Sequence, residues 1–347
     1  MKQADIVVVG GSAAGLTAAI TARRHYPEKS ILVVRKEEQV LIPCGIPYIF
    51  GTVGSPEKNL IPDSALEKNG IDLLLTEVES LDTEEKVLHA DGEEIKYERL
   101  ILATGSEPAM PPIPGLDLDG VYTVVKDVDY LKNLQAQLET ARDVVVIGGG
   151  FIGIEFGDEI NKLGGKSVSI VEMMPHCLML AYDEEFCVKM EETLESRGVN
   201  VSAPARVQRI SGNGRAEKVE LADGSAIDVD LVVVGVGAVA SVDLAKAAGL
   251  KIGPTGGIDV DRTMKTSADG VFACGDCAEK ISFFGGKPSR LKLASIAATE
   301  ARIAGANLFG IKRENPGTVG VWSTAVGDHA LATAGLTAAM AEDLGLA

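Results

Sequence analysis

The chain has 347 residues, of which 46% are apolar and 24% charged, so it has the composition of a soluble globular protein and is too long for one hydrophobic core. Its formal net charge of −17 argues against nucleic acid and anionic membranes as partners, because either would repel it. The N-terminus lacks the pattern of a signal peptide, and five irregularly spaced cysteines suit a reducing compartment, so we expect a cytoplasmic protein.

A first nucleotide-binding pattern opens the chain. An apolar strand over residues 5–9 leads into a turn of small residues from Gly10 to Gly15, and an alanine-rich helix then runs to residue 24. Small residues let the backbone approach a pyrophosphate, and the helix N-terminus supplies its amides and dipole. Ser12 stands where the middle glycine is usual, so a glycine-rich turn without a ligand is the alternative.

The second strand, over residues 31–34, departs from this pattern at its end. Such folds place an acidic residue there for the ribose hydroxyls, but here Arg35 and Lys36 follow the strand. Either Glu37 or Glu38 reaches the ribose from a shifted register, or other groups hold the ribose. The two basic residues would then contact phosphate or adenine.

The stretch Pro43-Cys44-Gly45-Ile46-Pro47-Tyr48 is the candidate reactive site. Proline removes a backbone donor and glycine loosens the chain, so the stretch predicts a shaped loop. With Pro47 as the first residue of a following helix, Cys44 would lie just before a helix N-terminus, which favours the reactive thiolate. The alternative is a small buried apolar residue.

The next elements complete the first part of the chain. They are a helix over 59–69, strands over 71–77 and 86–89, a hairpin through residues 91–92 to 94–97, and a strand and small-residue turn over 100–106. A cluster of prolines at 108, 111, 112 and 114 then predicts a crossover into another domain.

A second nucleotide-binding pattern follows. A helix over 126–140 and a strand over 143–147 lead into a full G-x-G-x-x-G from Gly148 to Gly153, with a helix through residue 162. The next strand, over 167–171, ends at Glu172. An acidic residue there accepts hydrogen bonds from both ribose hydroxyls and repels a 2′-phosphate, which favours NADH over NADPH. The sequence therefore predicts an α/β protein with two nested dinucleotide-binding domains.

The remaining elements return the chain to the first domain. They are a helix over 184–197, a hairpin tip over 219–224, a strand over 231–234, a helix over 244–249, a strand and turn over 271–277, a helix over 291–308, and a tail with a helix over 337–344. The spacing of Cys274 and Cys277 permits a disulfide, but both flank a Gly-Asp turn, and no second pair exists to bind zinc. We expect no metal site.

Together these motifs resemble the flavoprotein oxidoreductases with two dinucleotide domains, and within them the branch with a single active cysteine. This branch comprises coenzyme A disulfide reductases, NADH oxidases and peroxidases, and CoA persulfide reductases. The resemblance covers essentially the whole chain and implies two nested three-layer Rossmann-like domains. It assigns residues 1–115 and 245–315 to FAD binding, 116–244 to NAD(H) binding, and 316–347 to the start of an incomplete C-terminal dimerisation domain. With that domain complete, the protein would be a homodimer.

The resemblance also implies roles for single residues. The first glycine turn would hold the FAD pyrophosphate, the Ala103-Thr104-Gly105 turn would close over it, and the Asp276 carboxylate would bind the ribityl chain. The helix that opens near Ala294 would point its N-terminus at the flavin pyrimidine. The candidate FAD residues are Gly10, Ser12, Ala13, Ala14, Gly15, Arg35, Lys36, Val78, Thr104, Gly105, Asp276 and Ala294. The candidate NAD residues are Gly148, Gly150, Ile152, Gly153, Glu155, Glu172 and Gly237.

The same resemblance suggests a substrate. Arg23 and Arg24 match the position where coenzyme A disulfide reductases hold CoA phosphates, although cations favourably placed at a helix C-terminus are the alternative. Ala13 replaces the histidine of the peroxidases, which weakens the peroxidase interpretation. We therefore expect hydride to pass from NADH through FAD to a sulfur on Cys44, derived from a CoA disulfide or a persulfide. The alternatives are an NADH oxidase, with oxygen as acceptor and Cys44 as sulfenic acid, and an electron-transfer reductase for a small redox protein.

Overall fold

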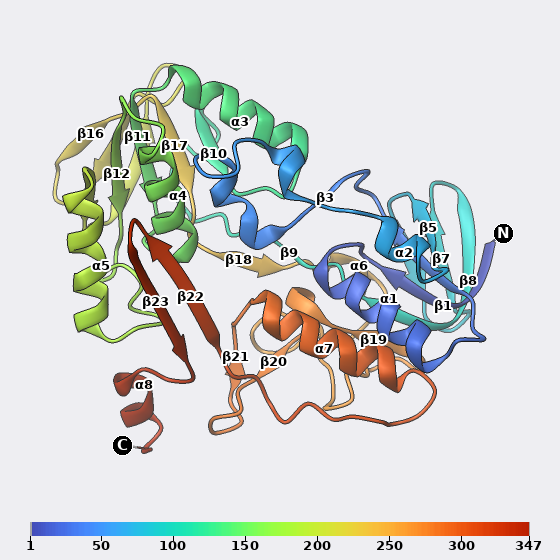
Figure 1. Cartoon of the computed structure of the whole chain (residues 1–347). Coiled ribbons are helices and arrows are strands. Elements are labelled where there is room, and N and C mark those ends of the chain that lie inside the picture. The colour runs from blue at the N-terminus through green and yellow to red at the C-terminus, as the bar shows by residue number, and fades with distance from the viewer. Residues whose placement is uncertain (1, 347) are drawn as a thin grey trace. The chain divides into compact units, whose positions relative to one another are not determined.

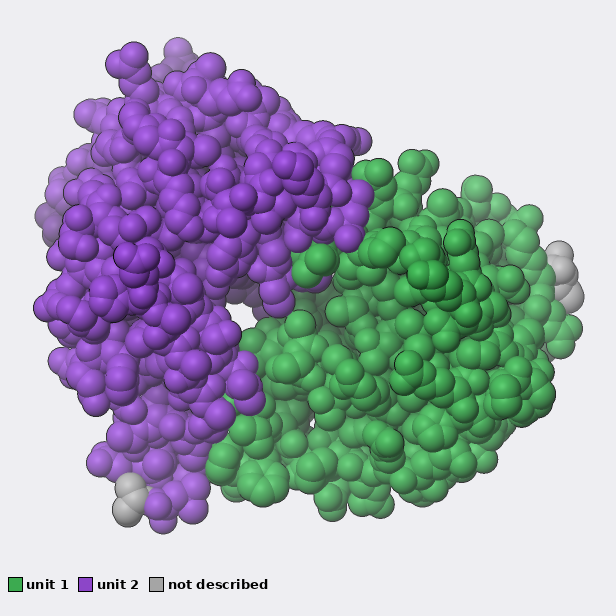
Figure 2. Space-filling model, viewed as in Figure 1, with its two compact units in different colours: residues 1–42, 61–107, 239–320 green, residues 43–60, 108–238, 321–347 purple. Residues whose placement is uncertain are grey.

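The computed structural model describes residues 2–346, which form two compact units (Figure 2). Unit 1 holds the described residues up to 42 together with 61–107 and 239–320. Unit 2 holds 43–60, 108–238 and the described residues from 321 onward. Within this described part of the chain, no helix is long and apolar enough to cross a membrane.

Unit 1 is built on a mainly parallel sheet with strand order β5-β2-β1-β8-β7-β6 and with β19 beside β8. Its central strands are continuous apolar runs buried on both faces, as parallel strands under covering layers must be. The strands are β1 (Lys2–Val9), β2 (Ile31–Arg35), β5 (Asp72–Leu75), β6 (Ser80–Asp82), β7 (Val87–Ala90), β8 (Glu93–Leu102) and β19 (Val271–Ala273).

Two long helices of unit 1, α1 (Ala13–His25) and α7 (Ala294–Asn307), pack side by side (Figure 1). Both are rich in alanine, so their backbones approach closely. A side chain added at Gly305 of α7 would meet the backbone of Ala18 and Ala22 in α1. The small residues of these helices therefore serve the packing of the layer.

Unit 2 is built on an all-parallel sheet with strand order β10-β17-β11-β12-β13. Alternate residues of these strands, such as Val145 and Ile147, share a core with an antiparallel sheet of β14, β15 and β16. Helix α4 lies against β11 and β12, so the parallel sheet is covered by helix and by sheet. The elements are β10 (Val121–Thr123), β11 (Asp143–Ile147), α4 (Phe151–Asn161), β12 (Ser167–Val171), α5 (Glu184–Ser196), β13 (Val199–Ser202), β14 (Val207–Ser211), β15 (Lys218–Leu221), β16 (Ala226–Asp228) and β17 (Leu231–Val234).

The other elements are short, apart from α3. The helices are α2 (Ser64–Glu67), α3 (Val128–Thr140), α6 (Asp243–Ala247) and α8 (Ala338–Asp343). The strands are β3 (Val40–Leu41), β4 (Leu60–Ile61), β9 (Ser106–Pro108), β18 (Ala238–Ala240), β20 (Lys280–Ile281), β21 (Pro288–Ser289), β22 (Val321–Val326) and β23 (His329–Ala334). The 3₁₀ turns are η1 (Pro43–Gly45), η2 (Pro47–Ile49), η3 (Pro56–Asn59) and η4 (Gly275–Cys277).

The predicted fold class is confirmed, since both units are α/β with parallel sheets. The predicted boundaries of the FAD- and NAD-binding parts stay a prediction, because compactness does not show which unit binds which nucleotide.

Two predicted elements are wrong. The helix predicted over 59–69 is reduced to α2, because Pro62 excludes the helical conformation at Ile61, which is in β4 instead. The two strands predicted between 94 and 106 are one strand, β8. Its first half pairs with β7 and its second half with β19, so no break is needed.

The Cys44 stretch forms η1 and η2, and Pro47 is the first residue of η2 as predicted. However, η2 has only three residues. A turn of this length has few aligned peptide dipoles, so the predicted α-helix after Cys44 is absent from this stretch, and the stabilisation of its thiolate stays a prediction.

Candidate active site

The first glycine turn lies in unit 1 between β1 and α1. Gly10 has a φ of 110°, and a side chain there would collide with the carbonyl of Ala103. A side chain at Gly15 would in turn collide with the carbonyl of Gly10. Ser12 is the N-cap of α1, but its side chain makes no capping hydrogen bond, and Ala13 and Ala14 begin the helix. The crowded backbone and the uncapped amides fit the pyrophosphate of a dinucleotide.

The Ala103-Thr104-Gly105 turn and the Gly275-Asp276 turn lie at the same edge of the unit 1 sheet. They follow β8 and β19, two parallel neighbours in which Leu102 pairs with Ala273. The Ser106 hydroxyl donates to Asp276 Oδ2 at 2.8 Å. The structure thus brings together the candidate FAD residues Thr104, Gly105 and Asp276, which the sequence separates by more than 150 positions.

Arg35 is a buried structural cation. Its guanidinium donates to both carboxylate oxygens of Asp63, at 2.6 and 2.8 Å, and to the carbonyls of Glu37 and Glu38. A side chain at Gly11 would collide with the Arg35 side chain, so the arginine packs directly under the glycine turn. This arrangement supports the turn and explains why a cation occupies the usual acidic position.

Two further candidate FAD residues have structural partners in unit 1. Lys36 forms an exposed ion pair with Glu77 at 2.9 Å, and the hydrogen bond to Glu77 raises the pKa of Lys36. Val78 packs against the hydrophobic core of the unit. Contacts of Arg35, Lys36 and Val78 with FAD stay a prediction.

The full G-x-G-x-x-G turn lies in unit 2 between β11 and α4. Gly148 has a φ of 105°, and a side chain at Gly153 would collide with the carbonyl of Gly148. Gly150 is the N-cap of α4, and apart from its chain neighbours and the backbone of α4, no atom of residues 2–346 lies within 4 Å of the place where its side chain would begin. The N-terminus of α4 therefore has open space for a pyrophosphate.

Glu172 lies beside this turn. Its Oε2 accepts the Gly149 amide at 2.5 Å and its Oε1 accepts the Met174 amide at 2.7 Å. A carboxylate oxygen can accept more than one hydrogen bond, so these contacts orient Glu172 and leave capacity for ribose hydroxyls.

Two more candidate NAD residues lie in unit 2. Ile152 lies in the first turn of α4 and approaches Gly235. Gly237 has a φ of 103°, and its carbonyl accepts the Ala109 amide at 2.9 Å. Ile152 thus lies at the start of α4, and Gly237 lies past the carboxyl end of the parallel sheet. Their assignment to NAD is compatible with the fold and stays a prediction.

Cys44 is exposed on a segment that unit 2 fixes to α4. Tyr48 donates its hydroxyl to Glu155 Oε1 at 3.2 Å, and the rings of Phe50 and Phe156 pack with centroids 5.2 Å apart. Farther along, the backbone amide and the hydroxyl of Thr52 donate to Glu159, at 2.7 and 2.9 Å. The helix that opens with the glycine fingerprint therefore also holds the segment of the candidate nucleophile.

Glu155 has an unusual environment for a carboxylate. Besides Tyr48, it accepts the Thr324 hydroxyl at 3.0 Å. Burial raises the pKa of Glu155, and burial together with Glu155 raises the pKa of Tyr48. Tyr48 and Thr324 also line a cleft of about 300 Å³ with residues of β22 and β23. No sequence pattern indicates this grouping, because Glu155 is 107 positions from Tyr48 and 169 from Thr324.

The comparison with protein families identifies the chain. Residues 4–301 match the model of the pyridine nucleotide-disulphide oxidoreductases. The chain belongs to this family. It is 33% identical over 343 residues to an NADH oxidase of Methanocaldococcus jannaschii, covering 96% of this chain and 76% of the relative. It is 34% identical over 344 residues to a CoA-dependent NAD(P)H sulfur oxidoreductase of Pyrococcus furiosus, covering 97% and 77%.

A solved structure agrees with these relatives. An NAD-dependent persulfide reductase from A. fulgidus superposes with a TM-score of 0.92 and 34% identity. The match covers 98% of this chain and 65% of that one. Pyridine nucleotide-disulphide oxidoreductases use FAD and a nicotinamide dinucleotide, and the chain has the fold and the sequence of such an oxidoreductase.

Within this family fold, the other cysteines are poor candidates for redox chemistry. Cys274 and Cys277 are buried reduced thiols, and burial raises the pKa of both. The Cys277 sulfur lies 3.5 and 3.3 Å from the carbonyl oxygens of Leu102 and Cys274, either of which can accept its single proton. A thiol without access to solvent and with a disfavoured thiolate is unreactive, which favours the structural interpretation of this pair.

The two candidate CoA-binding arginines differ in their surroundings. Arg23 donates to four backbone carbonyls, those of Pro27, Lys29, Asn69 and Gly70. Four of its five donors are therefore engaged, which favours a structural role at the end of α1. Arg24 is exposed, and its contact with a CoA phosphate stays a prediction.

Proposed function

We propose that this family member oxidises NADH and reduces a sulfur compound bound at Cys44. The observation that carries the proposal is the attachment of the exposed Cys44 segment to α4, the helix of the NAD fingerprint. The similarity to a CoA-dependent sulfur oxidoreductase and to a persulfide reductase supports the substrate class, which would be a CoA disulfide or a persulfide.

The two nucleotides would bind at the two glycine turns. FAD would lie on unit 1, with its pyrophosphate at Gly10, Ser12 and Gly15 and its ribityl chain at Asp276. NADH would lie on unit 2, at Gly148, Gly150 and Gly153. Glu172 is held by the amides of Gly149 and Met174, so its charge would face a ribose and disfavour a 2′-phosphate. NADH is therefore the proposed donor in preference to NADPH.

Cys44 would act as nucleophile and leaving group. Its thiolate attacks one sulfur of a disulfide R–S–S–R, so that a Cys44–S–S–R bond forms while RS⁻ leaves. The mixed disulfide then takes up two electrons and one proton, releases RSH and regenerates the Cys44 thiolate. FAD, when bound, supplies the relay that accepts two electrons from the nicotinamide and passes them on.

An anaerobic titration tests the role of Cys44. Protein loaded with FAD is first oxidised with CoA disulfide, freed of excess reagent, and then titrated with NADH while the flavin spectrum is followed. We expect wild type to consume two equivalents and Cys44→Ser one. The control Cys187→Ser removes a buried thiol of the same unit and should still consume two. If wild type consumes only one equivalent, Cys44 is not a redox centre and an electron-transfer reductase becomes the better interpretation.

An NADH oxidase is the second candidate, favoured by the name of the relative from Methanocaldococcus jannaschii. In this case Cys44 would cycle through sulfenic acid with oxygen as acceptor. It predicts rapid NADH consumption in air without any sulfur compound, whereas a sulfur reductase needs its substrate for fast turnover.

A further inference from the structure

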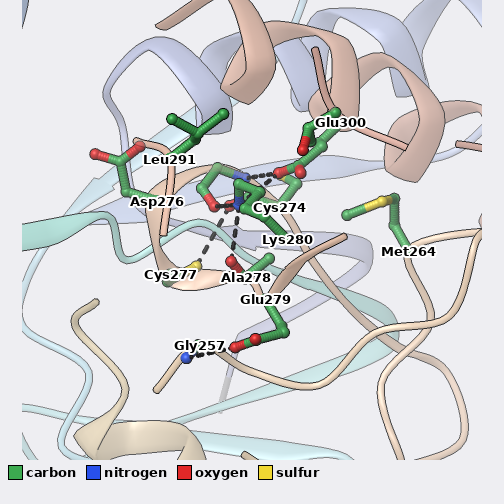
Figure 3. A network of polar contacts seen from close by, with 12 residues as sticks. Gly257, Met264, Cys274, Asp276, Cys277, Ala278, Glu279, Lys280, Leu291 and Glu300 are labelled. Carbon is green, nitrogen blue, oxygen red and sulfur yellow. Dashed lines mark hydrogen bonds and ion pairs between the residues drawn. The ribbon is translucent and has the colours of Figure 1, made fainter. Parts of the chain in front are cut away.

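Neither residue of a buried ion pair in unit 1 is among the candidate site residues. Lys280 of β20 and Glu300 of α7 are 2.9 Å apart, and their side chains are 3% and 1% exposed. Figure 3 shows Lys280 and Glu300 next to the turn that carries Asp276. Two charges in a protein interior are unfavourable unless both are paired and hydrogen-bonded.

The pair holds the turn by both backbone groups of one residue. The Gly275 amide donates to Glu300 Oε2 at 3.0 Å, and the Gly275 carbonyl accepts Lys280 Nζ at 2.5 Å. The same ammonium group donates to the Ala278 carbonyl at 2.7 Å. These two carbonyls and the Glu300 carboxylate accept all three N–H donors of Lys280. The ion pair therefore holds η4, the turn that carries Asp276, through its backbone groups.

The enclosed turn lies where the predicted FAD elements of unit 1 meet. Gly275 has a φ of 78°, and its side chain, if present, would lie 2.7 Å from Ala14 in the first turn of α1. Asp276 is held from the other side by Ser106. The pair thus connects α7 to the turn, and the turn packs on the N-terminus of α1.

Stability alone is a weak reason to keep this pair. Replacement of a buried ion pair by neutral residues of similar volume is often neutral or stabilising. Moreover, Glu300 Oε1 is buried and has no hydrogen-bond partner within residues 2–346. The remaining function that matches the contacts is control of the backbone of η4.

We propose that Lys280 and Glu300 are positioning residues for FAD, which fix the Gly275-Asp276 turn in the shape that holds the cofactor. The proposal rests on the proposed function, in that FAD must bind to unit 1. It concerns residues that do not themselves contact the cofactor, and it predicts that FAD retention and protein stability respond differently to neutralisation of the pair.

The test compares Lys280→Met/Glu300→Gln with wild type. The double variant is neutral, and its introduced glutamine keeps an acceptor for the Gly275 amide, but the turn carbonyls lose their ammonium donors. Two quantities are measured: thermal unfolding of the apoprotein, and the rate of FAD release from the loaded protein, followed by flavin fluorescence. The control Lys251→Met breaks an exposed pair with Asp259 in the same unit.

We expect the double variant to unfold near the wild-type temperature and to release FAD at least about tenfold faster, since hydrogen bonds that shape the site are lost. Lys251→Met should match wild type in both measurements. The single variant Lys280→Met removes the cation beside the buried Glu300 carboxyl and should also lose stability. The proposal is overturned if the double variant retains FAD as wild type does, or if FAD release accelerates only in proportion to lost stability. If wild type itself binds no FAD, the proposed function fails instead.

Discussion

Glu300 gives the stability of unit 1 a specific pH dependence. Burial raises the pKa of its carboxyl from the usual 4.5 to about 7, although Lys280 and the Gly275 amide oppose the shift. Asp276 adds to it. Because the pKa is higher in the folded than in the unfolded state, the contribution of this group to stability is fully present below pH 4.5 and is lost as the pH rises through 7.

The variant Glu300→Gln should remove this dependence. We expect the free energy of unfolding of wild type, relative to the variant, to fall by up to about 3 kcal/mol between the two pKa values, because a tenfold change in proton affinity corresponds to about 1.4 kcal/mol. Urea unfolding of both proteins at several pH values between 4 and 8 measures this difference in unfolding free energy. A difference that is constant across this range would show that Glu300 stays ionised in the folded protein.

Charged residues are the hardest to assign from sequence. Arg35 ends β2, where a ribose ligand is usual, and only the structure shows that Asp63 holds its guanidinium. Arg23 is a candidate for CoA binding by its position in the sequence, but it donates to carbonyls of two chain segments. A cation's function depends on which acceptors the fold brings to it, and those acceptors lie up to 47 positions away.

At the scale of elements, α4 links the second glycine turn to the Cys44 segment. Glu155, Phe156 and Glu159 each contact a different residue of that segment. Glu159 is buried and also pairs with Lys162, so the position of its carboxylate does not depend on Thr52 alone. The position of the Cys44 segment on α4 should therefore depend on these hydrogen bonds.

Substitution of Thr52 by valine tests this attachment. The change keeps the shape of the side chain but removes its hydroxyl donor to Glu159, and we expect a loss of about 1 kcal/mol in unfolding free energy. Thr140→Val is the matched control, since the Thr140 hydroxyl only bonds within the exposed end of α3; its effect should stay within about 0.5 kcal/mol. Equal effects in urea unfolding would mean that the Thr52 hydroxyl contributes nothing specific.

The elements themselves are largely predictable. The predicted bounds of β11, β12 and β17 match the structure, because each is a short apolar run that ends at a glycine turn or an acidic residue. Contacts between elements that are distant in sequence are not predictable in this way. The Thr324 hydroxyl of β22 bonds to Glu155, and no local pattern encodes a contact between a terminal hairpin and a helix in the middle of the chain.

At the scale of the whole molecule, each unit is assembled from three separate pieces of chain. The first glycine turn, the Gly275-Asp276 turn and α7 all belong to unit 1, whereas the second glycine turn and Cys44 belong to unit 2. Composition and strand patterns predict two nucleotide folds, but not that residues 43–60 join the second, because that choice depends on side-chain contacts with α4.

Amide hydrogen exchange should show which unit each nucleotide protects. The first amides of α1 and α4 have no side-chain cap and should exchange rapidly until a pyrophosphate accepts their hydrogen bonds. We expect FAD, added to FAD-free protein, to protect residues 10–16 and 275–277 in unit 1. NADH, added to the loaded protein, should protect residues 149–154 in unit 2.

NADPH at the same concentration should protect the second turn less than NADH, because Glu172, which accepts the Gly149 amide, is the proposed ribose ligand and its carboxylate would repel a 2′-phosphate. Glu172→Gln keeps an acceptor for the Gly149 amide while removing this charge, and it should narrow the difference between the two nucleotides. Protection by NADH of residues 10–16 in FAD-free protein, without protection of residues 149–154, would contradict the assignment of the nucleotides to the units. Equal protection by NADH and NADPH in wild type would contradict only the role of Glu172, because the glycine turn binds the pyrophosphate that both nucleotides share.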